Sequence, residues 1–562
     1  MARGAITAGL LDRRRSWILA IPIALILGAY VLYPSIQMFA EGLTADGLPD
    51  MFSRRGNANT RALVNSVWIS VLSVLGAGVL GTGMAYGFYR FDFPFRKTLM
   101  AIAALPLALP PLVGVLAFLF LYGESGIIPR GLQVIFGLEE VPFAFEGLPA
   151  VWLVHVYSFY VYFYLFVSAA FRGIDRSVIE ASGDLGASGW TTFSRVLLPL
   201  LRPALVSASL LVFMISMASF TAPLLFAGTE NFLTLQIYNY KTNGNLAMSA
   251  AIASLLTLIC LAFLAMIEMD RKARTGSSAS KGAGAPPIPL TSGWARSIVG
   301  VVGLTLLVVL LLPIAVIVLI SFVQEGSWTY QVLPQAYTLA NYGSLFSQAD
   351  VFEPIRNSLV MATMATAANV VFGVAAALLI THGAIRGRAA FRTIAMLPFA
   401  IPGTVIAINL IVTFNEPTVA GFGQVLVGSF WLLPLAYFIR NIPLVVRATV
   451  SALESYDPKL SEASLDLGAG ASTTFWRVML PILAPSILAG TLLTFVAALG
   501  EFVSSILLYN FDNRPISVEI LAQLRLYDFG AAAAYSVLLM ILVGLATLAV
   551  RRMGGSAESG AI

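Results

Sequence analysis

Residues 180–203 read EASGDLGASGWTTFSRVLLPLLRP, and residues 462–485 read EASLDLGAGASTTFWRVMLPILAP. Sixteen of the 24 aligned positions are identical, at a shift of 282 residues in a chain of 562. Chance does not produce sixteen identities in 24 aligned residues, and the two stretches are separated by half the length of the chain. The chain therefore contains an internal duplication, and its best preserved part is a polar stretch.

The matched stretch predicts a helix–turn–helix in each copy. Glu180 and Asp184 are four residues apart and so share one face of a short helix, with Ala181 beside them. Gly186 supplies a break where the chain can turn. The second copy repeats this set with Glu462, Ala463, Asp466 and Gly468.

Each hairpin offers a small side chain and carboxylates to a partner, and two copies imply a partner with two equivalent grooves. A hairpin with only a structural role is the alternative.

The composition predicts a membrane protein. Hydrophobic residues make up 58% of the chain and charged residues only 11%, whereas roughly a quarter of a soluble protein is charged. A spanning helix needs about 20 mostly apolar residues, and such runs recur along the chain. We predict an all-α membrane protein of about twelve transmembrane helices, with spans at 17–39, 62–88, 98–122, 148–171, 201–226, 245–268, 296–322, 355–382, 393–415, 428–446, 482–508 and 529–550.

Further matches extend the duplication outward. Asn65-Ser66 pairs with Asn357-Ser358, and Leu105-Pro106 pairs with Leu397-Pro398, at a shift of 292. Each half then has six helices in the same orientation, an arrangement known from transporters. We predict a first half at 1–268 with its hairpin loop at 172–200, a linker rich in Gly, Ser, Ala and Pro at 269–295, a second half at 296–552 with its hairpin loop at 447–481, and a tail at 553–562.

Basic residues orient these spans, because cytoplasmic loops carry an excess of Lys and Arg. An orientation with Arg13, Arg14 and Arg15 inside also puts most of the 33 basic residues inside. We therefore predict cytoplasmic termini, a cytoplasmic linker and cytoplasmic hairpins.

Some polar residues and prolines within the spans are candidates for a translocation pathway. Glu501 lies about 20 residues beyond Pro481, roughly 30 Å along its helix, and an intramembrane carboxylate suggests function. The alternative is that it reaches outer water or a helical partner. Its repeat counterpart is Ser219. The other candidates are Asn65 and Asn357, which could instead cap helix ends, and Pro106 and Pro398, which could instead shape the helices.

The sequence favours neither a metal site nor a catalytic site. Cys260 is the only cysteine, and His155 and His382 are far apart, so all three are interpreted as packing residues. None of the five lysines lies in a GxxxxGK[ST] phosphate loop. We assign no catalytic residue and no metal ligand.

At the duplicated stretch the chain resembles the permease family of binding-protein-dependent ATP-binding-cassette (ABC) importers, of the MetI-like type I fold. The family signature is Glu-Ala-Ala, three residues, Gly, nine residues, a hydrophobic residue, one residue and Leu-Pro. It matches Glu180, Ala181, Gly186, Leu198 and Pro199, and again Glu462, Ala463, Gly468, Leu480 and Pro481. Ser182 and Ser464 depart from it, since alanine is usual there.

The resemblance implies a fused double permease without an ATPase site of its own, in the bacterial cytoplasmic (inner) membrane. Its partners would be two copies of a cytoplasmic ATP-binding-cassette ATPase, an extracytoplasmic substrate-binding protein and membrane lipid, but no nucleic acid. The chain itself would bind no cofactor, because ATP is used by the partner subunits.

The stretch from Leu499, LGEFVSSILLYNFDNRPISVEI, most resembles the ferric-iron subfamily. Ferric iron is therefore the expected cargo, with thiamine, phosphonate or polyamine as alternatives. A secondary transporter of the major facilitator type is the main rival class, and a membrane-embedded enzyme is a more distant one.

Overall fold

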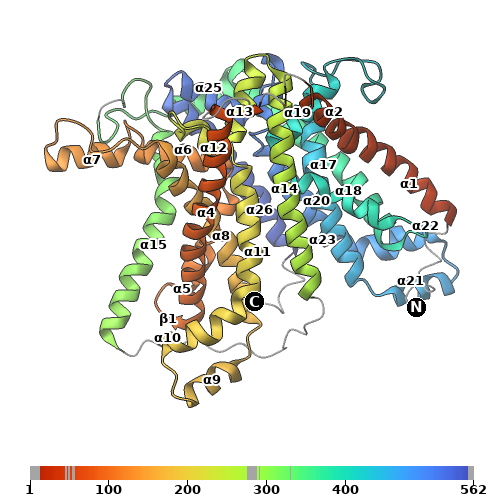
Figure 1. The fold of residues 1–562 in the computed structure, drawn as a ribbon, viewed down its shortest axis with the longest axis horizontal. Helices are drawn as coiled ribbons and strands as arrows, with labels where there is room; N and C mark the ends of the chain where they lie inside the picture. Colours follow the sequence, from red (N-terminus) through yellow and green to blue (C-terminus); the bar gives the residue numbers. More distant parts are fainter. Residues whose placement is uncertain are drawn as a thin grey trace. The chain divides into compact units, whose positions relative to one another are not determined.

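The computed structural model describes residues 13–44, 47, 51–52, 57–274, 288–289, 292–328 and 331–554. Within these ranges the elements are almost all helices (Figure 1). Two strands of two residues each, β1 (Phe91–Asp92) and β2 (Ile288–Pro289), pair in parallel. Most of the linker predicted at 269–295 and the tail predicted at 553–562 lie outside the described residues. The all-α fold is confirmed.

The described helices include eleven that are long and apolar enough to cross a membrane. A twelfth candidate is a bent pair, α18 (Arg388–Ala400) and α19 (Gly403–Phe414), whose axes differ by 108°. The chain is thus a multi-pass membrane protein, as predicted. Pro402 begins the second helix of the pair, and proline at that position supplies no amide hydrogen to continue the first.

The chain forms two compact units. The α4 unit covers residues 52–236 and 258–338. It holds α4 (Ala58–Arg90), α5 (Arg96–Ile102), η3 (Leu105–Ala108), α6 (Pro111–Tyr122), α7 (Ile127–Phe136), α8 (Gly147–Arg172), α9 (Arg176–Asp184), α10 (Gly189–Thr192), η4 (Phe193–Leu197), α11 (Leu198–Met217), α12 (Thr221–Phe226) and α15 (Gly293–Ile320). Helices α13 (Leu233–Thr242) and α14 (Leu246–Arg274) belong partly to each unit.

The α17 unit covers residues 1–51, 237–257 and 339–562. Besides α18 and α19 it holds α1 (Arg13–Leu27), η2 (Gly28–Leu32), α2 (Tyr33–Gly42), α16 (Ala340–Ser347), α17 (Ala349–His382), η5 (Val419–Gly421), α20 (Leu432–Ser455), α21 (Pro458–Asp466), α22 (Ala471–Thr474), η6 (Phe475–Met479), α23 (Leu480–Leu499), α24 (Ser505–Leu508), η7 (Phe511–Asn513), α25 (Ile516–Arg525) and α26 (Phe529–Gly554).

The same helix crossing lies at the centre of each unit. In the α4 unit, Gly81 brings α4 so close to α8 that an added Cβ would lie 2.9 Å from the amide nitrogen of Tyr164. In the α17 unit, Gly373 likewise lies against α20, where a Cβ would lie 3.3 Å from the nitrogen of Val446. These partners differ by 282 residues, so the shift of the hairpins also holds along α8 and α20.

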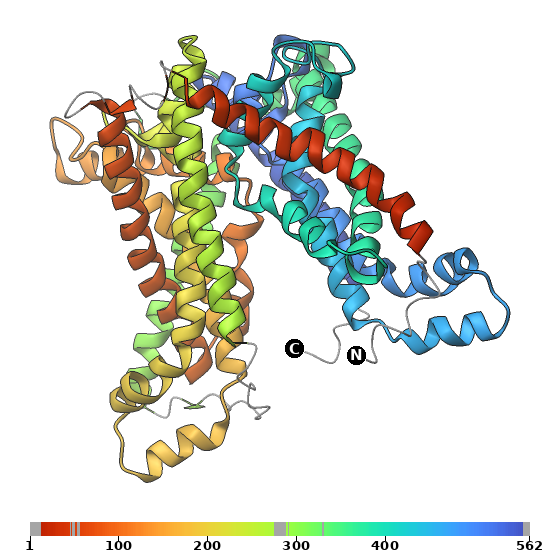
Figure 2. The same cartoon turned by 45° about the vertical axis from the view of Figure 1, so that its right-hand side comes forward.

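The first helix of each sequence half packs in the unit formed mainly by the other half. Ser16 at the start of α1 accepts a hydrogen bond from the Ala384 amide (2.9 Å), and Asn409 of α19 donates to Ser35 of α2 (3.1 Å). Figure 2 shows α1, in red, lying along helices of the α17 unit. Conversely, α15 packs against α5 and α6 in the α4 unit, and Tyr157 donates to the Leu310 carbonyl at 3.0 Å.

Four predicted spans are not single straight helices within their predicted bounds. One is the span predicted at 393–415, which is divided into α18 and α19. The span predicted at 98–122 is divided into α5, η3 and α6, because Pro106, Pro110 and Pro111 interrupt the backbone hydrogen bonds. The spans predicted at 201–226 and 482–508 end early, at Met217 and Leu499, where the chain leaves the helix at equivalent positions of the two halves. The two breaks lie at Ser219 and Glu501, both candidate pathway residues.

Candidate functional site

The first hairpin is built from α9 and α10. Asp175 starts α9 by accepting a hydrogen bond from the Ser177 amide at 3.0 Å. The helix ends before Gly186, whose φ of +76° places it in the left-handed region that ends many helices. The predicted helix–turn–helix is therefore formed, with Gly186 at the turn as expected.

The second hairpin, built from α21 and α22, has the same construction. Asp457 caps α21 through the Lys459 amide (3.1 Å), and Gly468 makes the turn with a φ of +82°. In both hairpins the residue after the turn glycine donates its amide to the carbonyl five positions earlier, at 3.1 Å, to Ser182 in one and Ser464 in the other. The sequence repeat is thus also a repeat of local geometry.

The serines that stand in place of alanine tie the arms of each hairpin together. The hydroxyls of Ser182 and Thr192 lie 2.9 Å apart, and those of Ser464 and Thr474 also lie 2.9 Å apart. Each bond joins the first arm to the second across the turn. The sequence shows only that serine replaces the usual alanine at these positions, and this contact was not predicted from it.

The outer face of each hairpin combines acidic, small and apolar side chains. Glu180, Ala181 and Asp184 are exposed on α9, while on α21 Ala463 and Asp466 are exposed and Glu462 is half-buried. The leucine before each turn glycine is almost fully exposed, at 88% for Leu185 and 89% for Leu467. The exposed leucine of each hairpin thus lies next to a carboxylate, Asp184 or Asp466, and is not part of a packed core.

A short π-helical segment joins each hairpin to the long membrane helix that follows. Segment η4 leads into α11, and η6 leads into α23, with no break between them. π-helical segments are rare and are frequent at functional sites. Each hairpin is therefore continuous with one helix that ends, at its far end, beside Ser219 or Glu501.

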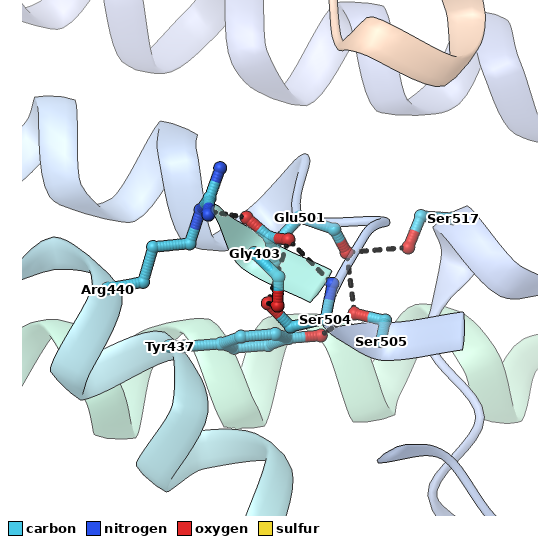
Figure 3. A network of polar contacts seen from close by, with 7 residues as sticks. All are labelled: Gly403, Tyr437, Arg440, Glu501, Ser504, Ser505 and Ser517. Carbon is cyan, nitrogen blue, oxygen red and sulfur yellow. Dashed lines mark hydrogen bonds and ion pairs between the residues drawn. The ribbon is translucent and has the colours of Figure 1, made fainter. Parts of the chain in front are cut away.

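Glu501 is buried and fully engaged (Figure 3). Its Oε2 lies 2.6 Å from Nε of Arg440 on α20, and its Oε1 accepts hydrogen bonds from the Ser504 amide and hydroxyl, at 2.9 and 3.1 Å. The Glu501 carbonyl accepts from the hydroxyls of Ser505 and Ser517, at 2.6 and 2.9 Å. Tyr437 lies 2.7 Å from Ser505 and donates to it, since Ser505 has already given its only proton.

The equivalent site around Ser219 is neutral. Ser219 lies 2.8 Å from Nε2 of His155, whose Nδ1 lies 3.0 Å from Ser73 and 3.1 Å from Ser216. The Ser219 carbonyl accepts from the Thr234 hydroxyl, just as the Glu501 carbonyl accepts from Ser517. His155 is thus a hydrogen-bonded packing residue, as expected, and the ion pair of Glu501 has no counterpart at Ser219.

A second ion pair is also present in the second half and absent from the equivalent place in the first half. Arg514 Nε lies 2.6 Å from Oε2 of the buried Glu519 on α25. The equivalent positions of the first half, at a shift of 283, are Asn231 and Gln236, joined by a neutral hydrogen bond of 2.6 Å. The second half thus carries ion pairs at two places where the first half carries uncharged groups.

Asn65 and Asn357 hold the chain just before α13 and α25. Asn65 donates to Glu230 (2.8 Å) and to the Asn231 carbonyl (3.1 Å), and Asn357 donates to the Asp512 carbonyl at 3.1 Å. The proposed capping of their own helices is wrong, because α4 begins at Ala58 with Asn57 as its cap and α17 begins at Ala349.

The two candidate prolines have different surroundings. Pro106 lies in the short helix η3, whereas Pro398 is buried within α18. Pro398 also lines a cavity of about 10 Å³, together with Ser35 and Asn409. That volume holds about one water molecule, so this cavity beside Pro398 is too small for a solute.

Arg440 is the polar residue that sequence reasoning missed. Its charge interrupts the apolar run predicted at 428–446, and this signal was present. Among the described residues no three His, Cys, Asp or Glu side chains gather in a way that could hold a metal ion. Cys260 is buried within α14.

Known proteins match the chain over most of its length. A family model described as "Binding-protein-dependent transport system inner membrane component" matches residues 77–273 and again 369–555. A probable ABC transporter permease protein, y4fN of Sinorhizobium fredii, is 30% identical over 524 residues, covering 91% of each chain. The ferric transport system permease protein FbpB of Actinobacillus pleuropneumoniae is 26% identical, covering 93% of this chain and 76% of its own.

Shorter relatives match about half as much of the chain. The sulfate transport system permease protein CysT of Salmonella typhimurium is 31% identical over 237 residues, covering 40% of this chain and 80% of its own. The family resemblance inferred from the hairpins is thus confirmed, including its double occurrence.

Proposed function

Because the chain belongs to the family of binding-protein-dependent transport system inner membrane components and is an ABC importer permease, we propose that it carries ferric iron, delivered by a binding protein and driven by two copies of a separate ATPase. Both six-helix halves are present in one chain, so one copy supplies the complete pathway. The termini, the linker and both hairpins lie on the cytoplasmic side.

The pair of matched hairpins carries this proposal. Each exposes a leucine beside carboxylates, and each is braced by a serine–threonine bond. Each is also continuous, through a π-helical segment, with a long membrane helix. An ATPase that binds both hairpins can therefore move α11 and α23 when it binds ATP. Such a movement shifts the equilibrium between two conformations of the membrane helices.

Ferric iron is proposed as the cargo because the long relatives named for their cargo are ferric transport permeases. Their similarity spans most of the chain, whereas the sulfate permease covers less than half. Uptake of radioactive ferric iron, by vesicles holding the assembled transporter with its binding protein, tests this. ATP-dependent uptake of radioactive thiamine, a phosphonate or a polyamine, with no ATP-dependent uptake of iron, would identify a different cargo.

A charge reversal on both hairpins tests the coupling role. We expect E180R/E462R to insert normally but to retain the ATPase at least about a hundredfold more weakly, because misplaced charges at an interface cost several kcal/mol. Co-purification of the ATPase and ATP-driven uptake are measured together. E139R/E140R, at two exposed acids outside the hairpins, makes the same charge change and should retain the ATPase. Undiminished co-purification and uptake in E180R/E462R would contradict the coupling role.

A further inference from the structure

Three neighbouring positions differ together between the two halves. At the shift of 282, Arg440 and Glu501 correspond to Ser158 and Ser219. At the shift of 292, Gly403 at the start of α19 corresponds to Pro111 at the start of α6. A Cβ on Gly403 would lie 2.7 Å from Nη1 of Arg440. The second half therefore has a guanidinium, a carboxylate that holds it and a glycine that leaves room for it.

Glu501 acts as the residue that positions Arg440. Both of its carboxylate oxygens already have protein partners within 3.1 Å, and the side chain is only 7% exposed. A carboxylate in this state has no face left for a solute. Arg440, the ion-pair partner of Glu501, is therefore a better candidate for contact with the cargo than Glu501 itself.

Unlike Glu501, Arg440 has polar atoms that the described part of the chain leaves unoccupied, and a partly exposed side chain. Only its Nε is occupied by Glu501, and among the described residues Nη1 and Nη2 have no hydrogen-bond partner. The side chain is 32% exposed, and Figure 3 shows one end of the guanidinium turned away from the network. Arg440 is eight residues into α20, roughly 12 Å from its start. A charge facing hydrocarbon at such a depth is costly, so intramembrane charges face water or partners.

We propose that Arg440, positioned by Glu501 and accommodated by Gly403, recognises an oxyanion on the cargo during its passage. The free edge of a guanidinium binds carboxylate, phosphate or sulfate oxygens in pairs, and its charge repels a bare cation. This inference rests on the proposed transport function and names the chemistry of the solute at this point. Ferric iron therefore passes Arg440 as a complex with oxyanion ligands rather than as a naked ion.

Chemical labelling of arginine tests the site without requiring transport. The full chain, in a detergent that contains no phosphate, is treated with phenylglyoxal, and the modified arginines are quantified by mass spectrometry. We expect sodium sulfate and sodium phosphate to slow labelling of Arg440 about tenfold, relative to sodium chloride at equal ionic strength, because they occupy hydrogen-bonding nitrogens. Labelling of Arg447, which is exposed on the same helix, should not change.

Two variants ask whether the positioning matters. E501Q and G403A both retain Arg440, but the first removes the opposite charge and the second crowds Nη1, so both should reduce the protection by sulfate. An Arg440 that is never labelled, or that is labelled equally with and without these anions, would overturn the proposal. So would an Arg440 protected in phospholipid nanodiscs before any anion is added but reactive in detergent, because its ligand would then be a lipid phosphate.

Transport separates this inference from the function on which it rests. In vesicles with the binding protein and the ATPase, R440Q and R440K should lower uptake of ferric citrate about tenfold, since an ammonium does not reproduce paired recognition. R440S/E501S recreates the neutral pair of the first half, so it should insert normally and show the same loss. R447Q is the matched control.

If wild-type vesicles take up no iron, the proposed cargo fails, while the labelling result still decides the oxyanion site. If wild-type vesicles take up iron and R440S/E501S does so equally well, the proposed cargo stands and the role of Arg440 is refuted.

Discussion

At the scale of single residues, Ser182 and Ser464 show what sequence comparison could not supply. The sequence places a small residue where the family has alanine, and size alone makes the exchange look neutral. The hydroxyl contact with Thr192 or Thr474 forms only after the chain has turned at the glycine. Ten residues separate the partners, and no periodic pattern of a single helix joins them.

The serine–threonine bond should contribute measurably to the rigidity of each hairpin. We expect S182A to destabilise the hairpin by about 1 kcal/mol, because Thr192 loses its partner, and S182A/T192V to lose less than the sum of the single changes. Amide hydrogen exchange of α9 measures this directly. The free energy of protection of the α9 amides is compared between the single and double variants. If the changes in this free energy simply add in the double variant, the two hydroxyls do not interact.

Of the ion pair between Glu501 and Arg440, the sequence indicated the carboxylate but not its partner. The position of the carboxylate in an apolar run identifies it as a candidate from sequence, and the structure places it in a buried network. The guanidinium lies in an earlier span, 61 residues back in the chain. Only the packing of α20 against α23 brings the two charges together, so the pairing could not be predicted from local pattern.

At the scale of elements, the existence of the spans was predictable and their interruptions were only partly so. The apolar runs gave the membrane helices, and prolines marked the breaks before α6 and α19. The breaks at Ser219 and Glu501 carry no proline and lie inside apolar sequence, so both spans were drawn too long. Beyond each break, the carbonyl of Ser219 or Glu501 accepts a hydrogen bond from a side chain of a later segment, Thr234 or Ser517, and no local sequence pattern shows such a bond.

The backbones of α4 and α8 come close together at Gly81. In G81A the new methyl group would lie 2.3 Å from the Tyr160 carbonyl oxygen, so the two helices must separate. We expect a loss of about 1–3 kcal/mol, the usual range for overpacking. G87A lies on the same helix, and its Cβ meets no atom within 4 Å, so it provides the matched control. Thermal unfolding of the purified chain compares the two, and equal midpoints would contradict a tight crossing.

At the scale of the whole molecule, the duplication predicted two similar halves but not the exchange of their first helices. The hydrophobic pattern of residues 17–39 shows that this segment is buried in something apolar, without showing in what. In the structure α1 and α2 pack with α17, α18 and α19, and α15 packs with α5 and α6. Exchange of equivalent helices leaves every local pattern unchanged, so only the tertiary contacts reveal it.

Cutting the chain between the halves tests the exchange. We expect fragments 1–274 and 292–562 to assemble when co-expressed, because each holds the first helix that the other requires. Either fragment alone should aggregate or be degraded, since an apolar surface is left uncovered. Affinity purification through one fragment and detection of the other give the measurement. A first fragment that is monodisperse by itself would show that the exchanged packing is dispensable.

The exchange also bears on how the protein is made. Helix α1 leaves the ribosome early, yet the surface it packs against begins with α17 at Ala349. At about 5–20 residues per second, synthesis of the intervening chain takes roughly 20–70 seconds. During that interval the first helix lies in the bilayer before α17, α18 and α19 have been made. The hydrogen-bond partners of Ser16, Ser35 and Tyr30 in the second half are then still absent. A nascent protein of this design is exposed to membrane quality control until its second half has emerged.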